Sequence, residues 1–233
     1  MGVTFPPHQI HILAGASGSG KTTLLLQALA SWERGQPFLS TVVPSKGVAY
    51  LVGDRTREEV DERVRHVKLE RVKVFGIVDD LRNATSRIKA LKYTPEKGLR
   101  DLIQEGFGDY DFDILVIDPI FLFLQGKIID YQDIALSLIT LNQFATERNL
   151  TLFAAHHATK ARTDFTFKRS QDRISGSSAF QGFSGTQMIL IDTAESGLST
   201  YDLHVIPHTM PPRTHAFVRG EDGYFIAVAK KSG

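Results

Sequence analysis

The chain has 233 residues, 42% of them hydrophobic, with 27 lysines plus arginines against 26 aspartates plus glutamates. This length and composition suit one α/β domain with a substantial core, and the near-neutral balance excludes a protein that is basic over its whole surface. The absence of cysteine excludes disulfides, thiolate zinc sites and cysteine nucleophiles. The sequence has neither an apolar run of about 18 residues nor a signal-peptide pattern, so we expect a cytoplasmic protein with no membrane partner.

Apolar runs alternate with helical stretches along most of the chain, which predicts βαβ units and a mostly parallel sheet flanked by helices. The expected parallel strands are 10–14, 47–52, 72–78, 114–117, 150–155 and 187–191. The expected helices are 22–30, 57–69, 84–90, 98–104 and 131–148.

The C-terminal part has a different pattern. Strand-like runs at 200–206 and 224–229 are separated by proline- and glycine-rich turns, which predicts an antiparallel hairpin or meander at the edge of the sheet. We therefore expect one domain over 1–233, with a core at about 8–193 and the hairpin or meander at about 198–230.

Residues 15–22 fit the pattern G-x-x-x-x-G-K-[ST] at every fixed position, which is typical of the phosphate-binding loop of nucleoside triphosphatases. An expected strand precedes this loop and an expected helix follows it, so backbone N–H groups and the helix N-terminus can converge on one anion. Lys21 should reach the β- and γ-phosphates, and the Thr22 hydroxyl should bind Mg²⁺. The alternative is a chance glycine-rich turn. The residues expected to contact ATP or GTP are Gly15, Ala16, Ser17, Gly18, Ser19, Gly20, Lys21, Thr22 and Thr23.

Four apolar residues at 114–117 lead directly to Asp118, the pattern called Walker B. Ligands bind at the carboxyl edge of a parallel sheet, so Asp118 should lie beside the phosphate loop and hold the Mg²⁺ shell through water. The alternative is an ordinary aspartate that ends a strand before Pro119.

Hydrolysis also needs a group that orients the attacking water. Pro119 occupies the position after Asp118, where some phosphate-loop enzymes carry this carboxylate. The strand at 47–52 leads instead to Asp54, which we predict to be the catalytic base. The alternative is that Asp54 is the N-cap of the following helix.

Two adjacent histidines, His156 and His157, end the expected strand 150–155. We expect one of them to contact the γ-phosphate and to transmit its presence to the following loop, with His156 preferred, although periodicity does not decide between them. The alternatives are a core histidine and a metal ligand; neighbouring residues on a strand point to opposite faces, which argues against a shared metal.

Taken together, these segments resemble the RecA-like ATPases, and within them the hexameric-helicase branch of RepA, DnaB and KaiC-type proteins. Residues 15–22 resemble Walker A, 48–54 the strand that carries the catalytic acid, 114–119 Walker B, and 152–160 the sensor segment of plasmid RepA helicases, with 175–178 similar to the next block of that group. The resemblance implies a RecA-like P-loop fold, ATP with Mg²⁺, and a hexameric ring or filament that holds nucleotide between subunits.

The sequence departs from this family at two places. The family usually has glutamate where Asp54 stands, and a shorter carboxylate predicts slower turnover. The family also carries a Lys/Arg pair that reaches the neighbouring subunit's γ-phosphate, and residues 205–208 contain no such pair. Arg213 and Arg219 are the nearest candidates for this trans finger; the alternative is that both are solvated turn residues.

Residues 160–183 form a basic and aromatic stretch after the sensor segment, at the position of the central-channel loop in RecA-like motors. Such a mixture can bind phosphates and stack on bases, although a solvated loop is the alternative. The residues proposed to contact single-stranded DNA are Arg162, Phe165, Phe167, Lys168, Arg169 and Arg173.

The predicted function is a Mg²⁺-dependent ATPase acting as a DNA-stimulated motor, helicase-like or recombinase-like, in replication or recombination of a plasmid, phage or mobile element. Its expected partners are single-stranded DNA, further copies of the chain, and replication or recombination proteins. The alternative is a KaiC-type regulatory ATPase that binds a protein partner.

Overall fold

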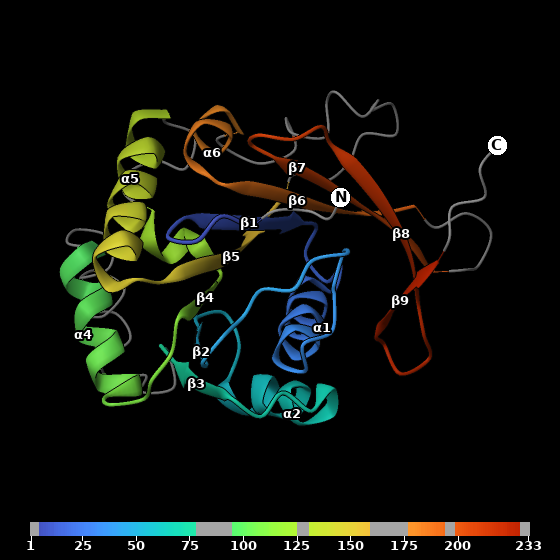
Figure 1. Cartoon of the computed structure of the whole chain (residues 1–233), viewed down its shortest axis with the longest axis horizontal. Helices are drawn as coiled ribbons and strands as arrows, with labels where there is room; N and C mark the ends of the chain where they lie inside the picture. Colours follow the sequence, from blue (N-terminus) through green and yellow to red (C-terminus); the bar gives the residue numbers. More distant parts are fainter. Residues whose placement is uncertain (1–4, 78–94, 125–130, 159–176, 194–198, 229–233) are drawn as a thin grey trace.

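The computed structural model describes residues 5–77, 95–124, 131–158, 177–193 and 199–228 (Figure 1). Within these residues a single sheet contains every named strand, in the order β3-β2-β4-β5-β1-β6-β7-β8-β9. The strands are β1 (Ile10–Gly15), β2 (Val48–Val52), β3 (Val72–Gly76), β4 (Ile114–Asp118), β5 (Thr151–His157), β6 (Thr186–Asp192), β7 (Thr200–Pro207), β8 (Arg213–Arg219) and β9 (Phe225–Val228). The helices are α1 (Lys21–Glu33), α2 (Arg57–Val67), α4 (Pro95–Phe107), the short 3₁₀ helix η1 (Ile120–Phe123), α5 (Tyr131–Arg148) and α6 (Ser177–Phe183).

Strands β1 to β6 pair in parallel, and β7, β8 and β9 continue the sheet as an antiparallel meander. The predicted fold class, a mostly parallel α/β sheet with C-terminal antiparallel strands, is therefore confirmed. Because the parallel strands share one direction, the carboxyl ends of β1, β2, β4 and β5 meet at one edge of the sheet, where ligands bind in folds of this kind.

Helices cover both faces of the sheet: α1 and α2 lie on one side, and α4, α5 and α6 on the other (Figure 1). Each face carries its own apolar core. Along β5, Leu152 and Ala154 belong to the core beneath α5, whereas Phe153 belongs to the core beneath α1. This alternation is the ordinary consequence of a strand that is buried on both faces.

The local sequence explains where helix α2 begins. The Thr56 side chain accepts a hydrogen bond from the Glu59 backbone N–H at 3.3 Å, and Glu58 and Glu59 place negative charge in the first turn. Val60 and Val64, one turn apart, form the buried stripe of this helix. Thr56 is thus the N-cap, and the alternative interpretation of Asp54 as the cap of this helix is wrong.

The structure contains three elements that the sequence analysis missed: the short η1 after β4, strand β8 and helix α6. Strand β8 lies where only turns were expected; Phe217 is its one buried residue, and the strand forms because β7 supplies a hydrogen-bonding edge. Helix α6 lies at the end of the stretch interpreted as a DNA-binding loop, and its Phe180 is fully buried in the core beneath α5. The helix expected at 84–90 lies outside the described residues.

No helix in the described part of the chain is both long enough and apolar enough to span a membrane.

Phe153 provides a test of this packing. Its side chain is 1% exposed, and its ring lies 5.5 Å from the ring of Phe5 and 5.4 Å from that of Trp32. Replacing Phe153 with alanine should lower the free energy of unfolding by about 3–5 kcal/mol, measured by urea denaturation, because it leaves a cavity between the sheet and α1. Leu136→Ala is the control, since Leu136 is 54% exposed and its loss should change stability by about 0.5 kcal/mol or less. Equal effects of the two substitutions would contradict this packing.

Candidate active site

The phosphate loop connects β1 to α1 in a conformation that its glycines permit. Gly18 and Gly20 have φ values of 77° and 95°, in the left-handed region that side chains disfavour. Gly20 is the N-cap of α1, and no side chain caps that helix end. The Ser19 hydroxyl is buried with no hydrogen-bond partner in the described residues. The loop therefore offers a helix N-terminus and an unsatisfied hydroxyl to an incoming anion.

Lys21 lies along this loop, 8% exposed. Its Nζ donates hydrogen bonds to the carbonyl oxygens of Gly15 and Ala16, at 3.0 and 2.9 Å. Burial lowers the pKa of Lys21, while the nearby carboxylates of Asp118 and Asp54 act in the opposite direction. An anionic ligand favours the charged ammonium in the same way as these carboxylates, so phosphate binding and Lys21 protonation support each other.

Asp118, at the end of β4, is the meeting point of three elements. Its Oδ2 accepts a hydrogen bond from the Thr22 hydroxyl of α1 at 2.7 Å and another from the Tyr50 hydroxyl of β2 at 2.7 Å. The side chain is 4% exposed. The structure therefore brings together Thr22 and Asp118, the two residues predicted to hold Mg²⁺.

Tyr50 was not recognised as a site residue from the sequence. It is fully buried on the α1 face, and burial, followed by the charge of Asp118, raises its pKa well above the usual range. Its hydroxyl therefore stays protonated and donates to Asp118 throughout the physiological range. The sequence did contain a signal, because a tyrosine inside an otherwise apolar strand needs a partner for its hydroxyl.

The side chains around Asp118 suit Mg²⁺. A hydroxyl and a carboxylate are hard oxygen ligands, which this ion prefers. The described residues contain no group of three His, Cys, Asp or Glu side chains that could form a metal cage. Magnesium usually takes one or two protein ligands and completes its shell with water and substrate phosphates. When bound, the ion would be supported by Thr22 and Asp118 and would supply positive charge to neutralise the charge that develops on the phosphates.

Asp54 and His157 face each other across the mouth of the site. Asp54 follows β2, and its Oδ2 lies 4.0 Å from Nε2 of His157, the last residue of β5. Burial raises the pKa of Asp54, and the charge of Asp118 raises it further. A raised pKa makes a carboxylate a stronger proton acceptor, which suits the predicted base.

The expectation that His156 contacts the γ-phosphate needs correction. His156 is 3% exposed, and its ring lies 4.8 Å from the ring of Phe180 in α6, on the face opposite the phosphate loop. His157 is on the face of Phe153 and α1, and it lines the cleft. The two residues alternate across the strand, and only the position of α1 shows which face carries the nucleotide site.

A cleft of about 260 Å³ joins these groups. This volume is slightly below the usual range for small-molecule sites, and it suits a triphosphate with its metal better than a whole nucleotide. Four cationic side chains and two carboxylates reach the cleft, so its net charge favours a polyanion. The lining residues are Ser17, Gly18, Gly20, Lys21, Thr22, Asp54, Arg55, Arg63, Asp118, Pro119, His157 and Arg219.

The two candidate finger arginines occupy different places. Arg219 lines the cleft of its own chain, which is not the placement expected of a trans finger. Arg213 is at the other end of β8 and does not line the cleft. The six residues proposed to contact DNA, between Arg162 and Arg173, lie outside the described residues.

Asp54→Asn tests the assignment of the base. The variant should bind Mg-ATP like the parent chain and lose turnover, because an amide cannot take the proton of the attacking water. In the parent chain, turnover should fall on acidification at a pH above the ordinary aspartate pKa of about 4, since the raised pKa protonates Asp54 earlier. Steady-state hydrolysis and nucleotide-binding titrations provide both readouts. The control is Asp111→Asn, an exposed acid before β4; turnover that survives in Asp54→Asn would overturn the assignment.

Tyr50→Phe tests the support of Asp118. Removing the hydroxyl leaves Asp118 with one donor fewer, and the Mg²⁺ concentration for half-maximal hydrolysis should rise by about 10-fold, as for other groups that orient metal ligands. Tyr110→Phe is the matched control, since Tyr110 packs near Gly47 at the opposite edge of the sheet. An equal Mg²⁺ requirement in the two variants would show that the Tyr50 hydroxyl does not tune the site.

Comparison with known families agrees with this geometry. Residues 2–163, more than half of the chain, match the model described as an AAA domain. No curated protein shows significant similarity to the chain. The matched region contains the phosphate loop, Asp54, Asp118 and both histidines. The chain therefore belongs to the AAA domain family of P-loop ATPases, and it is a nucleotide-binding ATPase domain.

Proposed function

We propose that this chain is a Mg²⁺-dependent ATPase whose turnover is stimulated by single-stranded DNA, a helicase-like or recombinase-like motor. Its setting would be replication or recombination of a plasmid, phage or mobile element, in the cytoplasm. One observation carries the proposal: His157 stands 4.0 Å from the predicted base and only three residues before Lys160, where the basic stretch begins.

The positions of the cleft residues support the following hydrolytic step. Lys21 and the start of α1 hold the β- and γ-phosphates, and Asp54 accepts the proton of a water in line with the γ-phosphate. Thr22 and Asp118 support the metal. Tyr50 keeps the Asp118 carboxylate in place through its 2.7 Å hydrogen bond.

A second cavity extends the cleft toward α2 and the β8–β9 turn. It measures about 320 Å³ and shares Arg63 and Arg219 with the first. The Tyr224 ring at its wall stacks on His66, with centroids 4.1 Å apart and planes at 5°. Flat rings and a guanidinium are good surfaces for a purine, so this cavity is the proposed place of the nucleobase and ribose.

Strand β5 links the phosphates to the basic stretch. The Ala158 N–H donates to the Gly15 carbonyl at 3.0 Å, which anchors the chain directly after His157 to the phosphate loop. A change at the γ-phosphate would act on His157 and then on the following residues, which carry cations and aromatic rings suited to a single strand. A ring or filament of further copies would place such stretches along one DNA strand.

The test is the rate of Mg-ATP hydrolysis with and without single-stranded DNA. We expect stimulation of at least several-fold at low salt, and a loss of stimulation as salt rises, because phosphate contacts release counterions. Replacing Arg162, Lys168, Arg169 and Arg173 together with serine should remove the stimulation and flatten its salt dependence.

Lys46→Ser is the control for that variant, because Lys46 is exposed before β2, at the edge of the sheet away from the cleft. Basal hydrolysis that ignores DNA at every salt concentration would overturn the motor proposal. That result would support the alternative, a KaiC-type regulatory ATPase with a protein partner.

A further inference from the structure

We propose that Arg219 is a catalytic residue that acts in cis: the β8–β9 turn delivers its guanidinium to the γ-phosphate held by the phosphate loop of the same chain. This inference deepens the proposed function and rests on its ATPase part, but not on DNA stimulation. It replaces the sequence-based expectation that this arginine serves a neighbouring subunit. Three sets of contacts support it.

The first set ties β9 to the helix that follows the phosphate loop. The Gln27 side chain of α1 forms two hydrogen bonds with the Phe225 backbone: its Nε2 donates to the carbonyl oxygen at 3.0 Å, and its Oε1 accepts from the N–H at 2.9 Å. An amide that pairs with both backbone groups of one residue acts like a short piece of neighbouring strand. The Gln27 amide therefore fixes the position of β9 along the axis of α1.

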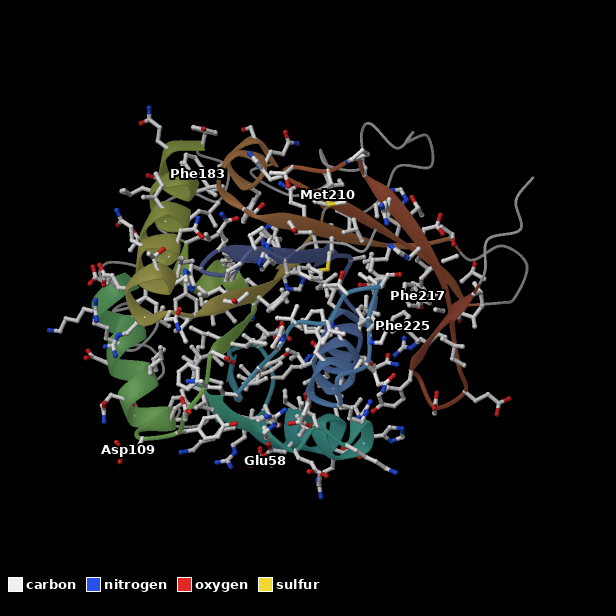
Figure 2. All side chains as sticks on the ribbon, in the orientation of Figure 1. Glu58, Asp109, Phe183, Met210, Phe217 and Phe225 are labelled. Atoms are coloured by element: carbon white, nitrogen blue, oxygen red, sulfur yellow. The ribbon has the colours of Figure 1, made fainter. Side chains whose placement is uncertain are left out.

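The second set is apolar and reaches the phosphate loop itself. The Phe225 ring packs so closely on Gly20 that a Cβ added to Gly20 would lie 2.7 Å from it. Phe217 of β8 lies beside it, with ring centroids 6.1 Å apart. Figure 2 shows both rings on the side of the C-terminal strands that faces α1. The phosphate loop thus packs directly against the β8–β9 hairpin of the same chain.

The third set ties the β8–β9 turn to α2. Tyr224 stacks on His66 with nearly parallel rings, as described above. Together with the contacts to α1, this stacking holds the turn at two helices of the same chain. Arg219 ends β8 at this turn, so its backbone is already fixed beside the cleft.

The side chain of Arg219 is oriented as well. Its Nε donates to the Gly223 carbonyl oxygen at 2.8 Å, across the turn. Gly223 has a φ of 81°, a conformation that glycine adopts without strain. This hydrogen bond uses one donor of the guanidinium, and an arginine has four more. The guanidinium then lines the cleft together with Lys21 and Arg63.

The positive charge of Arg219 in this position would stabilise the transition state of phosphoryl transfer. Phosphoryl transfer spreads negative charge over the γ-phosphate oxygens, and an arginine that contacts them raises the rate by about 10³–10⁵-fold. Arg63 of α2 lines the same cleft, and its Nη1 donates to the Thr23 hydroxyl at 3.3 Å. Arg213 begins β8, roughly 20 Å from Arg219 along the strand, and is outside the cleft. Arg219 is therefore the arginine that β8 presents to the phosphates.

The first experiment measures the preference for a triphosphate. A non-hydrolysable ATP analogue and ADP are titrated into the parent chain, Arg219→Ala, Arg219→Lys and the matched control Arg213→Ala. A γ-phosphate contact predicts that Arg219→Ala loses the preference for the analogue and keeps its ADP affinity, that the lysine variant recovers part of it, and that Arg213→Ala keeps all of it. Arg219→Ala that keeps the full preference would overturn the contact. This readout requires no turnover, so it stands apart from failure of the ATPase or DNA-stimulation proposals.

The second experiment separates cis from trans. Arg219→Ala and Lys21→Ala chains carry different tags, are expressed together, and are purified through both tags in succession. Each variant alone should be at least about 10³-fold slower than the parent chain. In a cis arrangement every site of the mixed complex lacks one essential group, so activity stays at the level of the variants.

Restored hydrolysis in the mixed complex would overturn the proposal, because a neighbour would then be supplying Arg219 to a site with an intact Lys21. If the two chains do not copurify, hydrolysis by the parent chain at the same concentration occurs without a neighbour, and this result supports cis action.

Discussion

A single carboxylate oxygen organises this protein. Oδ2 of Asp118 accepts hydrogen bonds from Thr22 and Tyr50, and so joins the helix of the phosphate loop, strand β2 and strand β4 at one point. A carboxylate that is 4% exposed is costly to bury unless charged or polar partners compensate it. The two hydroxyls and the nearby Lys21 supply that compensation. The same arrangement that stabilises the buried charge leaves hard oxygen ligands at the floor of a cleft.

Charge then explains the rest of the cleft. Four cationic side chains and two carboxylates line the cleft, so positive charge is in excess. The cationic side chains repel one another when no anion is bound. A triphosphate relieves this repulsion, and its binding energy is available to order the groups around it. Asp54 and His157 are the partly exposed members of the lining, whereas Thr22 and Asp118 are buried.

The C-terminal meander is part of the nucleotide site as well as an extension of the sheet. Gln27, Phe225 and the Tyr224–His66 stack attach it to α1 and α2, the two helices that flank the loop. A ligand that moves the phosphate loop will therefore also act on β9, and through it on the open edge of the sheet. The end of β5 is attached to the phosphate loop as well, because the Ala158 N–H donates to the Gly15 carbonyl oxygen directly after His157. The elements around the phosphate loop are therefore attached both to the meander and to the end of β5.

The sequence alone determined the local features of this protein. The phosphate loop, Asp118 at the end of an apolar strand, and the helix over 131–148 depend on residue type and spacing within a few turns of chain, and the structure has each element where it was expected. Periodicity and turn chemistry are properties of neighbouring residues, which is why they can be read from order alone.

Only the tertiary structure decided which distant groups share the cleft. Choosing His157 over His156 required knowing which face of β5 lies under α1, and Tyr50 became a site residue only when β2 and β4 paired. Strand β8 was missed because just one of its residues is buried; its formation depends on the edge of β7. The place of Arg219 depends on contacts between residues nearly 200 positions apart, such as Gln27 with Phe225, and no local pattern encodes such a contact.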